Sequence, residues 1–180
     1  MLKHLRLILT VATLAWASAG GAADGNVEAG KYTTTQLAVA GAVENRLLLT
    51  VDDLKALPSR EMGSLPIVCQ SGATTSTIQS LKGVLLRDVL EKAVLVLKDH
   101  NDAKKMAVIA TASDGYKVVF SWSEIFNSPL AEGILVFYER DGRPLDEAEG
   151  RIALISAKDT RTGPRHVKWL SGVEVRKIVD

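Results

Sequence analysis

The sequence predicts one α+β domain in which short strands outnumber short helices. Three observations support this class. Short apolar runs recur between turn signals such as the Asp114-Gly115 pair. Helical spacing is confined to brief stretches, of which 85–93 is the clearest. The 180 residues contain no internal repeat and no linker that would divide them, so one domain accounts for the length.

Strands are expected wherever a short apolar run is bounded by turn-forming residues. We assign β character to residues 37–41, 46–51, 65–69, 106–112, 116–122, 134–138, 151–156, 167–170 and 173–178. The Asp141-Gly142 pair marks a further turn after the sixth of these segments. The alternation of strands and turns predicts a mixed-sheet architecture with few helices.

Helix boundaries follow from capping residues. Thr50 is a predicted N-cap, because Asp53 stands three residues later, where its carboxylate can bond back to the cap. The helix that begins there ends at Pro58, which cannot continue it. The segment 85–93 has apolar residues on one helical face. A third short helix is expected over 123–127, capped by its first residue, a serine.

The N-terminus has the layout of a secretory signal peptide. Basic residues precede the apolar run 7–17, and small residues follow it, so we assign 1–19 to a cleaved leader, with a second possible cut after Ala23. The apolar run is shorter than the roughly 20 residues of a membrane-spanning helix, which argues against the alternative of an uncleaved anchor. Residues 20–35 then form a flexible lead-in, and 36–180 form the domain. A periplasmic protein is expected.

Charge and cysteine content exclude several classes of protein. The chain has 22 Lys and Arg against 21 Asp and Glu, and removal of the leader with Lys3 and Arg6 leaves 20 against 21. This balance gives no reason to expect nucleic acid as a partner. We also expect the protein to be a monomer. A single cysteine excludes an internal disulfide and a multi-cysteine metal site. No zinc-ligand spacing, Gly-x-Ser-x-Gly elbow or dinucleotide fingerprint is present.

Cys69 is the first candidate site residue. It ends an apolar segment and opens onto the hydroxyl-rich stretch 71–77, where Gly72 allows close approach. The thiol could be a ligand for a soft metal or a reactive group, and the hydroxyls could hold a polar ligand. A buried small side chain beside an ordinary solvated loop explains the same residues.

The segment around Asp114-Gly115 is a second candidate. A tight turn there could place Ser113, Asp114 and Tyr116 at the rim of a pocket. Turn chemistry alone also accounts for this composition.

The densest cluster of functional side chains lies near the C-terminus. Arg161, Arg165 and Lys168 stand beside His166 and Trp169 at the entrance to a predicted strand. Arginine forks bind phosphate or carboxylate, so Arg161, Arg165 and Lys168 are the expected polar contacts. His166 or Trp169 is expected to stack on a flat ring. The cluster therefore suits an anionic or heteroaromatic ligand, whereas a solvated basic loop with the tryptophan in the core is the alternative.

The order of several motifs resembles the molybdopterin-binding domain of the sulfite oxidase family, over roughly residues 36–178. The motifs are Leu49–Pro58 leading into the strand that ends at Cys69, Gly83–Leu90, Ala112–Tyr116, Asp141–Leu145, Gly150–Ile155 and Arg165–Lys168. The resemblance implies that Cys69 would be the thiolate ligand of molybdenum and that the loop after it and 161–168 would face the pterin. The sequence departs from the family pattern at Leu81, where tryptophan is frequent, and at 69–73.

The chain is also similar in size and leader to small periplasmic pterin-binding proteins. This similarity implies a sensory module that binds a pterin and passes the signal to the periplasmic part of a membrane cyclic-di-GMP cyclase or phosphodiesterase. The alternative is a small molybdenum-cofactor oxidoreductase with Cys69 as metal ligand. A third possibility is an interaction domain whose cleft has no ligand.

Overall fold

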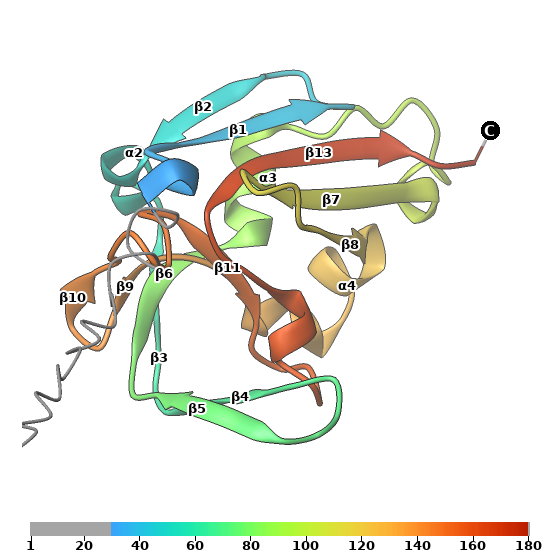
Figure 1. Cartoon of the computed structure of the whole chain (residues 1–180). Helices are drawn as coiled ribbons and strands as arrows, with labels where there is room; N and C mark the ends of the chain where they lie inside the picture. The colour runs from blue at the N-terminus through green and yellow to red at the C-terminus, as the bar shows by residue number, and fades with distance from the viewer. Residues whose placement is uncertain (1–29, 180) are drawn as a thin grey trace, which may run out of the picture.

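Two β-sheets and a separate β-hairpin form the frame of the computed structural model, which describes residues 30–179 (Figure 1). The predicted signal peptide and most of the predicted lead-in lie outside the described residues. Within 30–179, no helix combines the length and apolar character that a membrane crossing requires. The predicted α+β class with mixed sheets is confirmed.

The first sheet has five strands in the order β2-β1-β13-β7-β8. Their bounds are Gln36–Gly41 for β1, Leu47–Thr50 for β2, Met106–Ala112 for β7, Lys117–Ser121 for β8 and Leu170–Lys177 for β13. β1 and β13 run parallel, with Ala38 opposite Gly172, and the other neighbours run antiparallel. The last strand of the chain therefore occupies the centre of this sheet.

The second sheet has six strands, all antiparallel, in the order β12-β11-β9-β6-β3 with β10 attached to β9. Their bounds are Ser59–Met62 for β3, Leu81–Leu85 for β6, Ile134–Arg140 for β9, Arg143–Pro144 for β10, Ala153–Ser156 for β11 and His166–Val167 for β12. Strands β4 (Leu65–Val68) and β5 (Thr74–Ile78) pair only with each other.

The second sheet is buried on both faces, and alternate side chains of β9 show why. Ile134, Val136 and Tyr138 belong to the main core between the two sheets, whereas Leu135 and Phe137 belong to a second core. The β4–β5 hairpin covers that second core with its own apolar residues and crosses the base of the molecule in Figure 1. Because successive strand residues point to opposite faces, one continuous apolar run can serve both cores.

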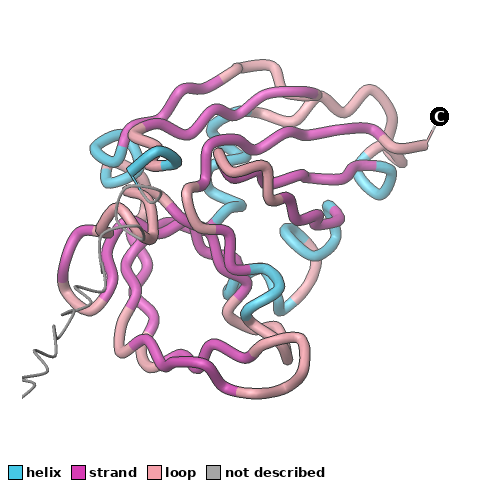
Figure 2. Tube along the Cα trace, in the orientation of Figure 1, coloured by secondary structure: helices cyan, strands magenta, loops and turns pink. Residues whose placement is uncertain are grey.

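Short helices join and cover these sheets (Figure 2). They are α2 (Val51–Lys55), α3 (Leu86–Ala93) and α4 (Trp122–Phe126), with single 3-10 turns η1 (Ala103–Lys105), η2 (Pro129–Gly133) and η3 (Gly163–Arg165). The capping box of Thr50 and Asp53 is confirmed. The predicted cap of the third helix was wrong: Ser121 caps α4, because its Oγ accepts from the Glu124 N–H at 3.2 Å.

Four strands escaped prediction: the two-residue β10 after the Asp141-Gly142 turn, and β5, β3 and β6. The stretch 71–77 was expected to be a loop, but from Thr74 onward its β-branched threonines pair with β4 as β5. β3 has the polar sequence Ser-Arg-Glu-Met and lies at the sheet edge, where apolar alternation is not required. β6 contains Gly83, beside which the pairing register with β9 shifts, as in a β-bulge.

Candidate functional site

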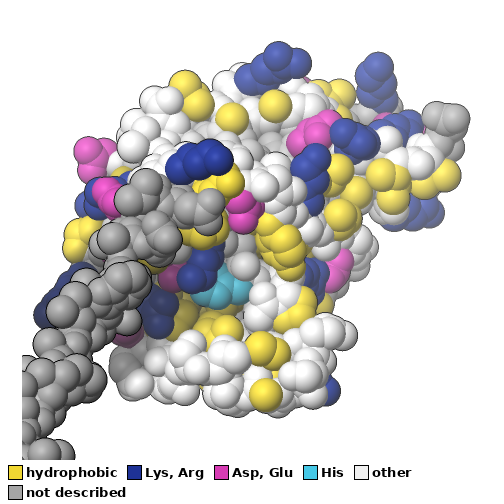
Figure 3. Space-filling model, in the orientation of Figure 1, with side chains coloured by type: hydrophobic (Ala, Val, Ile, Leu, Met, Phe, Trp, Pro, Cys, Tyr) yellow, Lys and Arg dark blue, Asp and Glu magenta, His cyan; other side chains and the backbone are white. Residues whose placement is uncertain are grey.

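Five of the nine candidate residues line one open hollow of about 210 Å³, which we call the His166 hollow. They are Asp114, Tyr116, His166, Lys168 and Trp169. The first two follow β7, His166 begins β12, and the last two connect β12 to β13. In Figure 3 a histidine lies between the upper sheet and the lower hairpin, framed by basic and acidic side chains.

The turn between β7 and β8 supplies one rim of the hollow. Asp114 Oδ1 accepts a hydrogen bond from the Tyr116 N–H at 2.8 Å, which fixes the carboxylate. Among residues 30–179, no hydrogen bond reaches Asp114 Oδ2. The Tyr116 hydroxyl donates to the Pro164 carbonyl at 2.7 Å, while the side chain stays 45% exposed. The rim therefore offers a free carboxylate oxygen and an accessible aromatic ring.

Trp169 forms a fixed wall. Its φ of 50° lies in the left-handed region, which is unfavourable for a bulky residue and is retained only where the surroundings impose it. The Trp169 N–H donates to the Glu149 carbonyl at 2.8 Å, and the indole Nε1–H donates to the Glu147 carbonyl at 2.7 Å. Its ring contacts the Tyr32 ring, with centroids 5.7 Å apart.

A buried carboxylate lies behind the hollow. Glu149, whose side chain is 5% exposed, contacts His166 Nε2 through Oε1. Its Oε2 accepts from Arg140 Nη1 at 3.1 Å and lies 4.0 Å from Lys168 Nζ. Burial by itself raises the pKa of Glu149, but the hydrogen bond with His166 and the nearby charges of Lys168 and Arg140 hold that pKa below its ordinary value. Glu149 is thus an anion that organises two walls of the hollow.

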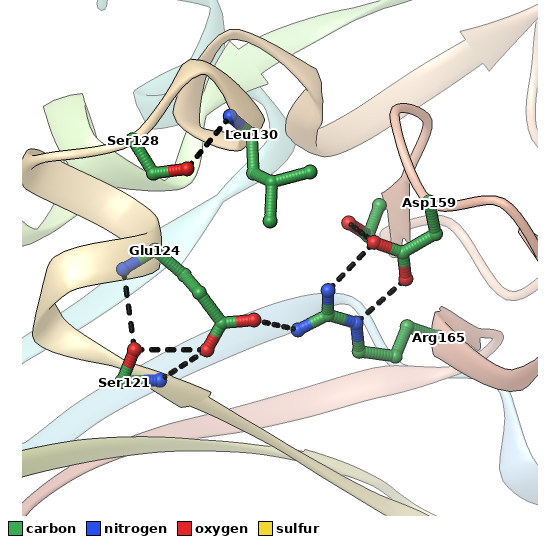
Figure 4. A network of polar contacts seen from close by, with 7 residues as sticks. Ser121, Glu124, Ser128, Leu130, Asp159 and Arg165 are labelled. Carbon is green, nitrogen blue, oxygen red and sulfur yellow. Dashed lines mark hydrogen bonds and ion pairs between the residues drawn. The ribbon is translucent and has the colours of Figure 1, made fainter.

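Arg165 belongs to the scaffold (Figure 4). Its Nε and Nη2 donate to Asp159 at 2.7 and 2.6 Å, and its Nη1 donates to Glu124 at 2.8 Å. The guanidinium also covers the Phe120 ring at 4.4 Å. The Asp159 hydrogen bond is the main reason that the pKa of Arg165 is raised. The guanidinium that was predicted to contact a ligand is therefore bound by protein carboxylates. Through these bonds Arg165 anchors the η3 turn that precedes His166.

The remaining three candidates lie outside the hollow. The Ser113 hydroxyl donates to the Tyr32 carbonyl. Cys69 is half-buried in the turn between β4 and β5, where its carbonyl accepts from the Gly72 N–H at 2.9 Å. Arg161 crosses this turn and donates to the carbonyls of Gln70 at 3.1 Å and Cys69 at 3.4 Å.

Sequence reasoning missed Glu149, Arg140 and Tyr32. Three carboxylates lie within 146–149, and no periodicity distinguishes the buried one from its exposed neighbours. Arg140 ends a strand, where a solvated cation is the ordinary expectation. Tyr32 lies in the stretch 20–35 that was predicted to be a lead-in, where no ring contact with Trp169 was foreseen.

Comparison with known proteins assigns the family. A family model described as the oxidoreductase molybdopterin binding domain matches residues 24–179. The chain belongs to this family. The fold agrees with the solved structure of the sulfane dehydrogenase SoxCD from Paracoccus pantotrophus, with a TM-score of 0.58 and 16% identity. The match covers 79% of this chain but 38% of the SoxCD chain, and a search of curated proteins found no match.

The residues of this molybdopterin-binding domain fit the pterin part of the cofactor. The fit rests on the kinds of side chain present, since the volume of about 210 Å³ lies below the range of roughly 300–1,000 Å³ typical for ligand pockets. Cys69 would be the thiolate for molybdenum, and its backbone borders η3 at Gly163, next to the Pro164 that binds Tyr116. Among residues 30–179, no group of three or more His, Cys, Asp or Glu side chains is placed to hold a metal ion.

Proposed function

We propose that the protein binds a pterin in the His166 hollow and acts as a periplasmic ligand-binding module. The observation that carries the proposal is the convergence of an acid, a lysine, a histidine and two aromatic side chains from separate segments on one hollow. A small-molecule site usually combines a small number of convergent polar groups with a largely apolar and aromatic surface.

The hydrogen-bonding groups of the hollow match those of a pterin. The pyrimidine ring of a pterin presents an amino group and a ring N–H beside one another, and a carboxylate such as Asp114 accepts from both. The carbonyl at the other edge of that ring accepts a hydrogen bond, which the Lys168 ammonium can donate. Lys168 is 44% exposed and 4.0 Å from Glu149, so its remaining N–H groups are available.

Tyr116 is the best stacking partner for the ring. Sequence reasoning favoured His166 or Trp169 for this role, but Trp169 is held against Tyr32 and the 147–149 loop. His166 is 9% exposed and its Nε2 is committed to Glu149. Tyr116, by contrast, is 45% exposed, and its hydroxyl is anchored to Pro164. An aromatic ring fixed at one end can cover a flat ligand with little loss of rotamer freedom.

The cellular role in the proposal follows from the N-terminal pattern and the sequence resemblance. A leader at 1–19 directs the chain to the periplasm, where it would collect a pterin and pass the signal to a membrane cyclic-di-GMP cyclase or phosphodiesterase. Co-purification with the periplasmic part of such an enzyme, strengthened by pterin, would support this role. Co-purification that is equally strong with and without pterin would contradict the proposed signalling role.

Calorimetric titration with neopterin and tetrahydrobiopterin tests the binding. We expect the Asp114→Asn and Lys168→Met variants to bind roughly 10- to 100-fold more weakly, because a hydrogen bond to a charged group contributes about 1.5–3 kcal/mol. Lys104→Met is the matched control, since Lys104 is exposed beside the opposite end of β7. Absence of binding below millimolar concentration, or equal affinity in all three variants, would refute the proposal.

The alternative is a small molybdenum-cofactor oxidoreductase, which the family match and the position of Cys69 favour. Bound molybdopterin would supply oxygen-atom or electron transfer at the metal, with Cys69 as the protein thiolate. Molybdenum analysis of protein taken from its native compartment, compared with Cys69→Ser, decides this alternative. Stoichiometric metal that is lost in the variant supports it. A purely structural interaction domain predicts no stabilisation by any pterin, whereas a ligand at 100 times its Kd adds about 2.7 kcal/mol.

A further inference from the structure

A second, larger cavity of about 650 Å³ has Glu149 in its lining, and we call it the Arg140 cavity. Its lining residues are Arg140, Asp141, Arg143, Pro144, Leu145, Asp146 and Glu149. They come from the end of β9, from β10 and from the loop that follows it. No residue of this cavity was a candidate at the level of sequence.

The carboxylates of this cavity are occupied by groups of the protein. Asp141 Oδ1 accepts from the backbone N–H groups of Gln79 at 2.8 Å and Ser80 at 3.0 Å. Asp146 Oδ1 accepts from the Glu149 N–H at 3.0 Å. Both oxygens of Glu149 have partners, His166 and Arg140. All three carboxylates of the cavity are therefore engaged by groups of the protein.

The arginines, in contrast, have donors to spare. Arg143 is exposed, and among residues 30–179 its guanidinium has no hydrogen bond or ion pair. Arg140 donates one hydrogen bond, from Nη1 to Glu149, and its Nε lies 3.6 Å from Asp141 Oδ2. A guanidinium carries five N–H donors in a planar fork that matches carboxylate and phosphate.

We propose that the Arg140 cavity binds a small anion, a carboxylate or a phosphate ester, between the guanidinium groups of Arg140 and Arg143. Hydrogen-bonding capacity carries the proposal, because the arginines keep unused donors whereas the carboxylates are bound by protein groups. The lining has two arginines against three carboxylates, so its formal charge is negative. Pro144 and the buried Leu145 provide an apolar surface for a short carbon chain. This site shares Glu149 with the wall of the His166 hollow, but binding of an anion between the two arginines does not require a bound pterin.

Titration of the purified protein at low ionic strength with succinate and with glycerol phosphate, followed by NMR, tests this site. We expect Arg143→Gln to weaken binding at least tenfold and Arg46→Gln, another exposed arginine, to leave it unchanged. Preference for succinate or for glycerol phosphate identifies the anion, and either result supports the site. Equal weakening in the two variants, or no binding by either probe below about 10 mM, would overturn the proposal.

Discussion

Asp159 holds Arg165 with both carboxylate oxygens: Oδ2 accepts from Nε at 2.7 Å and Oδ1 accepts from Nη2 at 2.6 Å. Loss of this fork leaves Asp159 and Glu124 without their cation, so we expect Arg165→Ala to lower the free energy of unfolding by about 3 kcal/mol. Urea denaturation measures this change. Arg165→Lys should recover only part of it, because lysine lacks the planar fork.

The control for this prediction is Arg161→Ala. Arg161 is exposed, and within residues 30–179 it donates only to backbone carbonyls of the Cys69 turn, so its loss should reduce stability by less than about 1 kcal/mol. Similar losses in the two alanine variants would contradict the scaffold role of Arg165.

Thr162 fastens the β4–β5 hairpin to the rest of the domain. Its buried hydroxyl donates to the Pro66 carbonyl at 2.7 Å and accepts from the Val68 N–H at 2.9 Å. Thr162→Val keeps the shape but leaves both backbone groups unpaired, and we expect a loss of about 2–3 kcal/mol in thermal or chemical unfolding. The exposed Thr75, whose hydroxyl donates to the Ile67 carbonyl at 3.2 Å, provides the comparison. Thr75→Val should have a smaller effect, and the reverse order would count against this interpretation.

Gly150 is required by the position of Trp169. A Cβ on Gly150, whose φ is +83°, would lie 2.3 Å from Trp169 Cδ1 and 2.7 Å from its Cα. Gly150→Ala should therefore reduce stability by roughly 2–4 kcal/mol and alter the tryptophan fluorescence. Gly142→Ala introduces the same kind of backbone strain at φ +73° with nothing within 4 Å. Gly142→Ala should therefore reduce stability by less than Gly150→Ala does. Equal losses in the two variants would show that the Trp169 indole can move away from the added methyl group.

The lowered pKa of Glu149 predicts a stability loss on acidification. A carboxyl whose folded-state pKa lies below its unfolded value stabilises the fold fully above about pH 4.3, and this contribution disappears as the pH falls through the folded-state pKa. Between about pH 5 and 3, the free energy of unfolding should therefore decline more steeply in the wild type than in Glu149→Gln. The exposed Glu44 provides the control, because Glu44→Gln should follow the wild type. Parallel curves for all three proteins would exclude this role of Glu149.

Sequence reasoning located the core strands well and the polar interior poorly. Strands β7 and β9 were predicted because their apolar runs are long, and the Thr50 cap because its partner lies three residues away. β3 and β5 were missed because polar edge residues follow no apolar pattern. The pairing of Arg165 with Asp159 and Glu124 brings together three separate segments, and only the tertiary structure decides whether a cation meets a ligand or a carboxylate. Glu149 was missed for the same reason: its burial depends on tertiary contacts with His166 and Arg140, and no local sequence pattern predicts them.

The placement of β13 has a consequence for how the chain matures. The strand that joins β1 to β7 is synthesised last, so the two halves of the first sheet cannot meet until residues 170–177 are available. Synthesis at about 5–20 residues per second leaves the earlier strands unjoined for several seconds, and closing so long a loop is slow in itself. Strand order thus delays completion of the first sheet until its central strand has been synthesised.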